Sequence, residues 1–352
     1  DAVQVDTDDD PLPFPDATFS CVVSDSAIEH RYYPEKALVA FSWCIAKSDA
    51  EPQRFRDRKN MLFGGADLLW MYKWIAESTP KFPQITRQQI DDTLAHMKER
   101  YVRHNLSLRP VHMQYTRWMM MRGASDAKVR EHHEAWNLAR RDAYADCAAC
   151  ERAFDVEVYL HLRNVEGAKY AAKPLIEGDL GCTEVPHVTF AALLLPLLQA
   201  GEYDLAKRYH ERGYAITRDK KTLLVELALH LDYAARVGLL DRTVQMIERH
   251  ASWALESLRL RDKMRWLMAA EHAVRRLADG GRDTVLLRLP EQLPYYVETH
   301  RYEPRAVATH FAEHVDAIAA QFDARNGNTY VSETVRAHRA WAAERLEYLN
   351  LP

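Results

Sequence analysis

The sequence contains little glycine, and this scarcity excludes several classes of site. Only 12 of its 352 residues are glycine, about half the usual share of ~7%. No G-x-G-x-x-G or G-x-x-x-x-G-K-[ST] motif occurs, so the chain lacks the glycine-rich loops that bind dinucleotides and nucleoside triphosphates. Few tight turns are expected, whereas residues that favour helices are abundant.

Long apolar runs and an excess of basic residues are also missing. The longest apolar run, Phe190 to Leu198, is far shorter than the ~18 residues that a membrane-spanning helix needs. The 47 basic and 51 acidic residues are interleaved and give a net charge of −4, which argues against a nucleic-acid partner. Five cysteines are an odd number, which argues against a secreted disulfide framework. With no signal-peptide pattern at its start, we expect a cytoplasmic protein without a membrane partner.

The N-terminal part divides into an arm and a helical region. Acids and prolines crowd Asp6–Pro15, so residues 1–33 are predicted as an extended arm, with a short strand over Thr18–Val23. Residues 34–107 are predicted as an N-terminal helical cap. Its helices are expected from Pro34 to about Lys47, over Ala66–Glu77, and from Thr86 through Tyr101, where Thr86 and Gln89 have the spacing of a capping box.

From Leu108 onward the chain repeats a unit of apolar helix, tight turn and amphipathic helix. Three positions match between the units. The first is the turn residue, the second lies five positions after it, and the third lies four positions after the second. The second positions of successive units are 37 to 40 residues apart. A small side chain there lets the two helices cross closely, and Lys128 fits this role least well. The four aligned sets are Gly123, Lys128, His132; Arg163, Ala168, Ala172; Gly201, Ala206, His210; and Gly238, Thr243, Ile247.

This pattern resembles the tetratricopeptide repeat, whose period is ~34 residues and whose second helix carries an early alanine. The resemblance covers roughly residues 86–280, and Gln199–Ala206 matches best. It implies an all-α fold, a right-handed superhelical array of antiparallel helix pairs, with repeats over 108–281. Residues 282–352 are predicted as a C-terminal helical cap, with helices near Pro304–Ala324 and Ser332–Leu349.

Two short motifs extend the resemblance. The chain is similar to a group of uncharacterised bacterial tetratricopeptide proteins that carry Asp-Cys-x-x-Cys-Glu and Cys-x-x-Val-Pro-His. These motifs are found here at Asp146–Glu151 and Cys182–His187. The group implies no activity that can be carried over.

The same two motifs supply a candidate metal site. Cys147, Cys150, Cys182 and His187 have the residue types and the short spacings of a tetrahedral Zn²⁺ site. The first and third cysteines are 35 residues apart, which is close to one repeat, so connections between successive units would bring them together. Four protein ligands predict a structural zinc with no position open for substrate. The alternatives are ordinary packing and a redox-active Cys-x-x-Cys pair.

Function is predicted in two classes. The first is a scaffold that holds a protein or peptide on the concave face of the array. Glu226, His230 and Tyr233 follow one another at i, i+4 and i+7 on a first helix, so they should form one stripe on that face. The second class is a metal-dependent hydrolase, because His310, Glu313 and His314 match H-x-x-E-H, although a solvated helix face explains that match as well.

Overall fold

The structure is a computed structural model that describes residues 34–50 and 68–344. Of these residues, 74% lie in helices, which confirms the all-α prediction. The predicted arm over residues 1–33 and the strand over Thr18–Val23 lie outside the described residues. None of the helices in the described ranges combines the length and apolar character needed to cross a bilayer.

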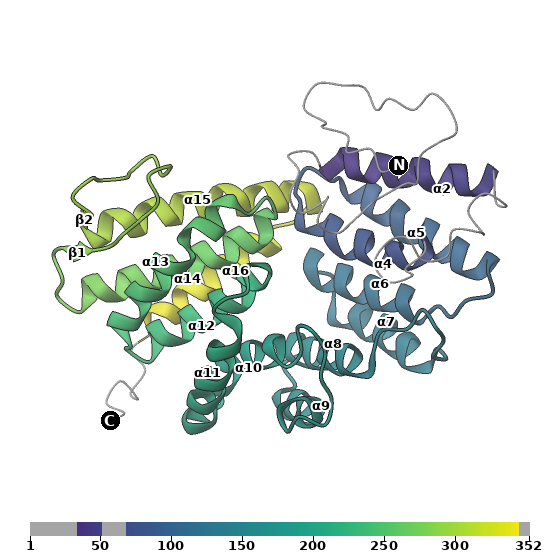
Figure 1. The fold of residues 1–352 in the computed structure, drawn as a ribbon, viewed down its shortest axis with the longest axis horizontal. Helices are drawn as coiled ribbons and strands as arrows, with labels where there is room; N and C mark the ends of the chain where they lie inside the picture. The colour runs from purple at the N-terminus through teal and green to yellow at the C-terminus, as the bar shows by residue number, and fades with distance from the viewer. Residues whose placement is uncertain (1–33, 51–67, 345–352) are drawn as a thin grey trace.

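The α-helices follow one another along the described chain, joined mostly by short turns and loops, and the longest connection within the described ranges spans residues 280–303 (Figure 1). A capping box at Thr86 starts α5 as predicted, with both of its hydrogen bonds present. The α-helices are α2 (Pro34–Ala50), α4 (Leu68–Ser78), α5 (Arg87–Arg103), α6 (Arg109–Arg122), α7 (Asp126–Leu138), α8 (Ala148–His161), α9 (Val165–Ile176), α10 (His187–Gln199), α11 (Tyr203–Thr217), α12 (Leu224–Arg236), α13 (Leu240–Glu256), α14 (Leu260–Asp279), α15 (Pro304–Asn326) and α16 (Tyr330–Ala343).

Short elements join some of these helices. Two 3₁₀ turns, η1 (Thr79–Lys81) and η2 (Lys221–Leu223), follow α4 and precede α12. Between α14 and α15, β1 (Val285–Leu286) and β2 (Arg301–Tyr302) pair antiparallel. The sequence did not predict this small ribbon. It also did not predict the disulfide in which Cys44 of α2 takes part.

The four predicted turn positions share one backbone conformation. Gly123, Arg163, Gly201 and Gly238 all have positive φ, at 74°, 58°, 77° and 79°. A left-handed residue ends a helix and lets the next one fold back beside it. The prediction of a turn at each of these four positions is therefore confirmed, with Arg163 holding a conformation that usually favours glycine.

The second matched positions of the repeat are buried in three of the four units. Ala168, Ala206 and Thr243 are each 0% exposed, which is consistent with a close crossing of the paired helices. Lys128 is exposed instead and pairs with Glu131 at 2.7 Å. The first helix pair therefore departs from the other three at this position.

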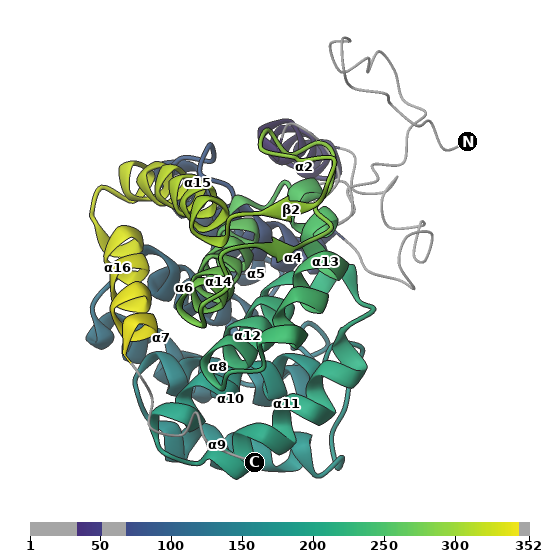
Figure 2. The ribbon, with the colours of Figure 1, turned by 90° about the vertical axis from the view of Figure 1, so that its left-hand side faces the viewer.

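The C-terminal helices return to the N-terminal ones. Figure 1 shows α2 and α4–α7 on one side of the molecule and α12–α16 on the other, with α8–α11 joining them. In Figure 2, which is turned by 90°, the two groups overlap along the line of sight and α8–α11 lie below them. Arg325, in the last turn of α15, donates hydrogen bonds to the carbonyl oxygens of Pro80, Phe82 and Ile85 at 3.2, 3.4 and 3.4 Å. Its guanidinium also lies 5.0 Å from the centroid of the Trp118 ring.

Two further contacts complete this closure. Asn328 donates to the carbonyl oxygen of Arg122 at 2.8 Å. Tyr330 packs so closely on Gly123 that a Cβ added there would lie 2.2 Å from the tyrosine ring. The segments predicted as caps at the two ends of an array are thus in contact with each other.

Candidate metal centre

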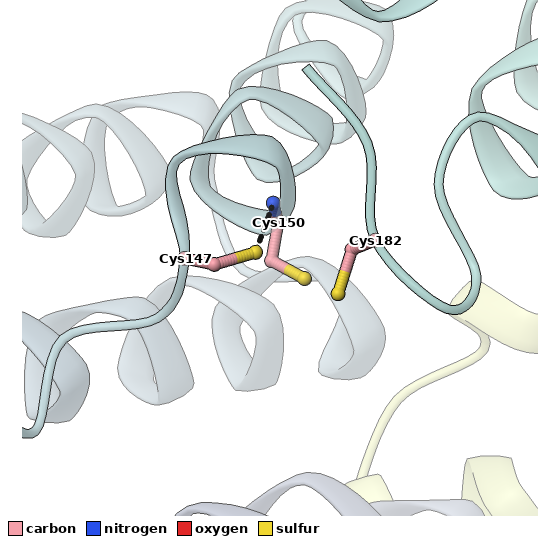
Figure 3. A group of neighbouring side chains, drawn as sticks. All are labelled: Cys147, Cys150 and Cys182. Carbon is pink, nitrogen blue, oxygen red and sulfur yellow. Dashed lines mark hydrogen bonds between the residues drawn. The ribbon is translucent and has the colours of Figure 1, made fainter.

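Three of the four predicted ligands converge. The sulfur atoms of Cys147, Cys150 and Cys182 all lie within 4.8 Å of one another. Figure 3 shows the first two at the start of α8 and the third on the connection that follows α9. Because these connections belong to successive helix pairs, the proximity expected from the 35-residue spacing is confirmed for the cysteines.

Asp146 fixes the loop just before the first cysteine. Lys73 of α4 donates to Asp146 Oδ1 at 2.7 Å and to the carbonyl oxygen of Tyr144 at 2.9 Å. The Lys73 ammonium also lies 3.3 Å from the centroid of the Trp70 ring. Only 2% of Lys73 is exposed, and burial lowers its pKa below the usual value. A buried ammonium needs its anionic partner, so this ion pair holds the loop to α4.

Glu151 anchors the other end of the same motif. Its carboxylate accepts two hydrogen bonds from Arg109, at 2.8 and 3.0 Å, and one from Arg141 at 2.7 Å. Arg141 also donates to the backbone oxygen of Asp146 at 2.7 Å. Both acids of the motif are therefore occupied by cations, and they orient the loop rather than serve as metal ligands.

Apolar packing places Cys182 beside α8. Its backbone and that of Val185 exchange two hydrogen bonds, at 3.0 and 3.3 Å, which close a tight loop. Val185 is 3% exposed and packs in a small cluster with Ala149 of α8 and Leu175 of α9. The loop that carries Cys182 is thus held directly against the helix that carries Cys150.

The electrostatics of the three thiols favour a bound cation. Burial raises the pKa of Cys147, but hydrogen bonds from the backbone N–H of Cys150 and from neighbouring groups outweigh it and hold that pKa below its usual value. Burial and the adjacent Cys147 sulfur raise the pKa of Cys150 well above its usual value. Like charges this close cannot all ionise unaided. A thiolate-binding cation would remove that restriction.

His187 is not part of this cluster. It is the first residue of α10, and it belongs to neither of the groups of converging ligand atoms found among the described residues. Its Nδ1 atom is buried without a hydrogen-bond partner, and burial lowers the pKa of the ring. The predicted fourth ligand therefore lies with its ring against the protein instead of beside the sulfurs.

The predicted partner-binding stripe on α12 is largely inaccessible. His230 is 0% exposed and Tyr233 is 3% exposed, so neither side chain can contact a partner. Only Glu226 is half-buried and reachable. The expectation was wrong for the two aromatic side chains because α10, α13 and α14 all pack against α12 and bury most of its surface.

The H-x-x-E-H residues do not form a metal site. The His310 ring stacks on Tyr295 with centroids 4.4 Å apart. His314 is exposed, and its Nδ1 lies 2.8 Å from the carbonyl oxygen of His310. Within the described part of the chain, these residues are not among the groups whose ligand atoms converge. The geometry therefore gives the hydrolase prediction no support.

A second convergent group was not predicted. Asp232 of α12 contacts His272 Nδ1 of α14 at 2.5 Å and His338 Nε2 of α16 at 3.0 Å. Arg236 also lies 3.3 Å from this carboxylate and 3.4 Å from the Trp341 ring. The arginine already neutralises the aspartate, so a divalent cation would add uncompensated charge to a buried site. We interpret the group as a hydrogen-bonded network that holds α16 against α12 and α14. Its members are too far apart in the sequence to be recognised as a motif.

Comparison of the chain with protein-family models, with curated proteins and with solved structures finds no match.

Proposed function

We propose that this protein is a helical scaffold in which a metal ion fastens two successive helix pairs and a protein or peptide partner binds the inner face. The observation that carries the proposal is the convergence of Cys147, Cys150 and Cys182 from two connections one repeat apart. The arrangement is that of tetratricopeptide-like helix pairs curved into a superhelix. In such arrays each unit packs mainly against its neighbours, so a clamp between two successive units strengthens the interface that joins them.

Zinc is the metal that this donor set fits best. Three thiolates favour a soft or borderline cation that tolerates tetrahedral geometry. The fourth position would be taken by water or, after rotation of its side chain, by His187. The two anchoring acids, Asp146 and Glu151, hold the first loop in place before the metal binds, which lowers the ordering cost of binding.

The metal proposal is tested by measuring zinc in the purified protein. We expect one zinc per chain in the wild type and none in C147A/C182A. The paired control H310A/H314A should retain the metal. Zinc lost from the control and kept by the cysteine variant would contradict the proposal and favour the hydrolase.

Chelation tests what the metal does. Metal binding free energy appears as folding free energy, so a chelator should lower the melting temperature of the wild type by at least roughly 5 °C. The melting temperature of C147A/C182A should not respond to the chelator. Equal responses of both proteins would show that the cysteines do not carry the effect.

The partner surface is tested separately at Glu226, which is the only reachable residue of the predicted stripe. A displayed peptide library should enrich sequences that bind the wild type and lose binding to E226K. Peptides that bind both proteins equally would place the partner surface elsewhere. The metal result does not depend on this outcome.

A further inference from the structure

Two arginines on α14 have no side-chain partner among the residues that the structure describes. Arg261 and Arg265 are one helical turn apart, so their side chains lie on the same face of α14. Both are half-buried, and within the described part of the chain neither makes a hydrogen bond or an ion pair. None of their side-chain nitrogen atoms is both fully buried and without a hydrogen-bond partner. Because these atoms make no hydrogen bond, they must be reachable from solvent.

The pair lies beside the contact that closes the molecule. Tyr330, which packs on Gly123, is close enough to influence the charge of both arginines. Arg325, which binds the carbonyl oxygens near η1, is close enough to Arg261 for the two cations to repel. The site is thus bordered by α14, α16 and the end of α15.

The surrounding carboxylates are already used. Asp262 pairs with Arg259 at 3.5 Å, and Glu157 pairs with Arg117 at 3.3 Å. Burial lowers the pKa of Arg261 to about 10, with repulsion from Arg265 as a further cause. Arg261 is also the second residue of α14, where the helix dipole disfavours a cation. Burial, repulsion between the two arginines and the helix dipole all disfavour the positive charges in the protein alone. A bound anion would offset these effects.

We propose that Arg261 and Arg265 form a binding site for a tetrahedral oxyanion of the phosphate class. Two guanidinium groups offer several donors in fixed planes, which match an anion with several acceptor oxygens and nearly two negative charges. The Tyr330 hydroxyl, which has no hydrogen-bond partner in the described structure, is available as a further donor. The site uses none of the three cysteines of the metal centre.

Inorganic phosphate is the first probe. Calorimetric titration of the full chain with sodium phosphate, against sodium chloride at equal ionic strength, should show saturable binding to one site. The double variant R261Q/R265Q should weaken that binding at least tenfold. The matched control is R276Q, since Arg276 is on the same helix, is half-buried and has no partner in the described structure. It should bind phosphate as the wild type does.

A melting experiment separates a ligand site from a structural role. Without phosphate, R261Q/R265Q should melt at the same temperature as the wild type or higher, because it lacks two desolvated, repelling charges. Phosphate should raise the melting temperature of the wild type and of R276Q but not that of the double variant. A double variant that melts lower without phosphate, or a wild type that responds to phosphate and chloride alike, would overturn the proposal.

A phosphoserine peptide and its unphosphorylated form distinguish the source of the anion. If the phosphopeptide binds more tightly than inorganic phosphate and depends on Arg261, the site is assigned to a peptide-borne phosphate. Equal affinity assigns it to the free anion. Both results support the site, whereas peptides that bind regardless of phosphorylation and of Arg261 count against it.

Discussion

The Nδ1 atoms of His210 and His230 face each other at 3.1 Å in the core between α11 and α12. One Nδ1 must donate and the other must accept, so the hydrogen bond is lost when both rings are protonated, and burial disfavours a charge on either ring. Burial lowers the pKa of His210 to about 4 and that of His230 well below its usual value.

This pair predicts a loss of stability in mild acid. Unfolded histidine has a pKa of about 6.5, and the folded values are lower, so the unfolded chain binds more protons below that pH. The stabilisation is complete above pH ~6.5 and declines as the pH falls toward 4. Between pH 7.5 and 5.0 we expect a loss of roughly 4 kcal/mol from the pair, measured by urea unfolding.

The variant H210F/H230L should lose much of this pH dependence. The control H104Q changes an exposed histidine and should keep it. An unchanged pH dependence in H210F/H230L would show that other groups govern acid unfolding.

Glu226 predicts a pH dependence of opposite sign. Burial raises its pKa to about 7, with nearby Asp262 and Glu184 as smaller causes. The folded state therefore binds the proton more tightly than the unfolded chain. Its stabilising effect is complete below pH ~4.5 and is lost as the pH rises through 7. The free energy of unfolding of E226Q should exceed that of the wild type by about 1–3 kcal/mol at pH 8 and match it at pH 4.5. The control is E333Q, which changes an exposed glutamate of α16.

The ion pair between Lys73 and Asp146 should be costly to break from one side. D146N leaves a buried ammonium without its counter-charge, which should destabilise the protein by about 3 kcal/mol. K73M/D146N removes both charges and should recover part of that loss in a double-mutant cycle. If the double variant is less stable than D146N alone, then Lys73 is held by its other contacts, and the loop before Cys147 does not depend on the ion pair.

Arg325 should control the closure of the molecule. R325A removes three hydrogen bonds to carbonyl oxygens and should cost about 2–4 kcal/mol. The radius of gyration from small-angle X-ray scattering should increase if α15 and α16 separate from the N-terminal helices. R305A, a surface variant with one contact to Asp279 at 3.4 Å, is the control. A lower stability with no change in dimensions would show that other contacts keep the closure intact.

Local features of this protein were predictable from sequence. The turns at Gly123 and Gly201 follow from backbone preferences of single residues, and the approach of Cys147 to Cys182 follows from the repeat length. The burial of His230 was not predictable, because it depends on how many neighbours surround α12. The contact of Arg325 with Phe82 was not predictable either, since nothing in a periodic pattern states where the two ends of an array meet.

The closure also limits how this chain can vary. An open array can gain or lose a helix pair at little cost, because each pair contacts only its neighbours. Here Arg325 must reach carbonyl oxygens more than 240 positions earlier in the chain, which is possible only for one total curvature. Deletion of a single helix pair would therefore abolish a distant contact as well as its own, so the number of helix pairs is set by geometry and the molecule has a fixed size.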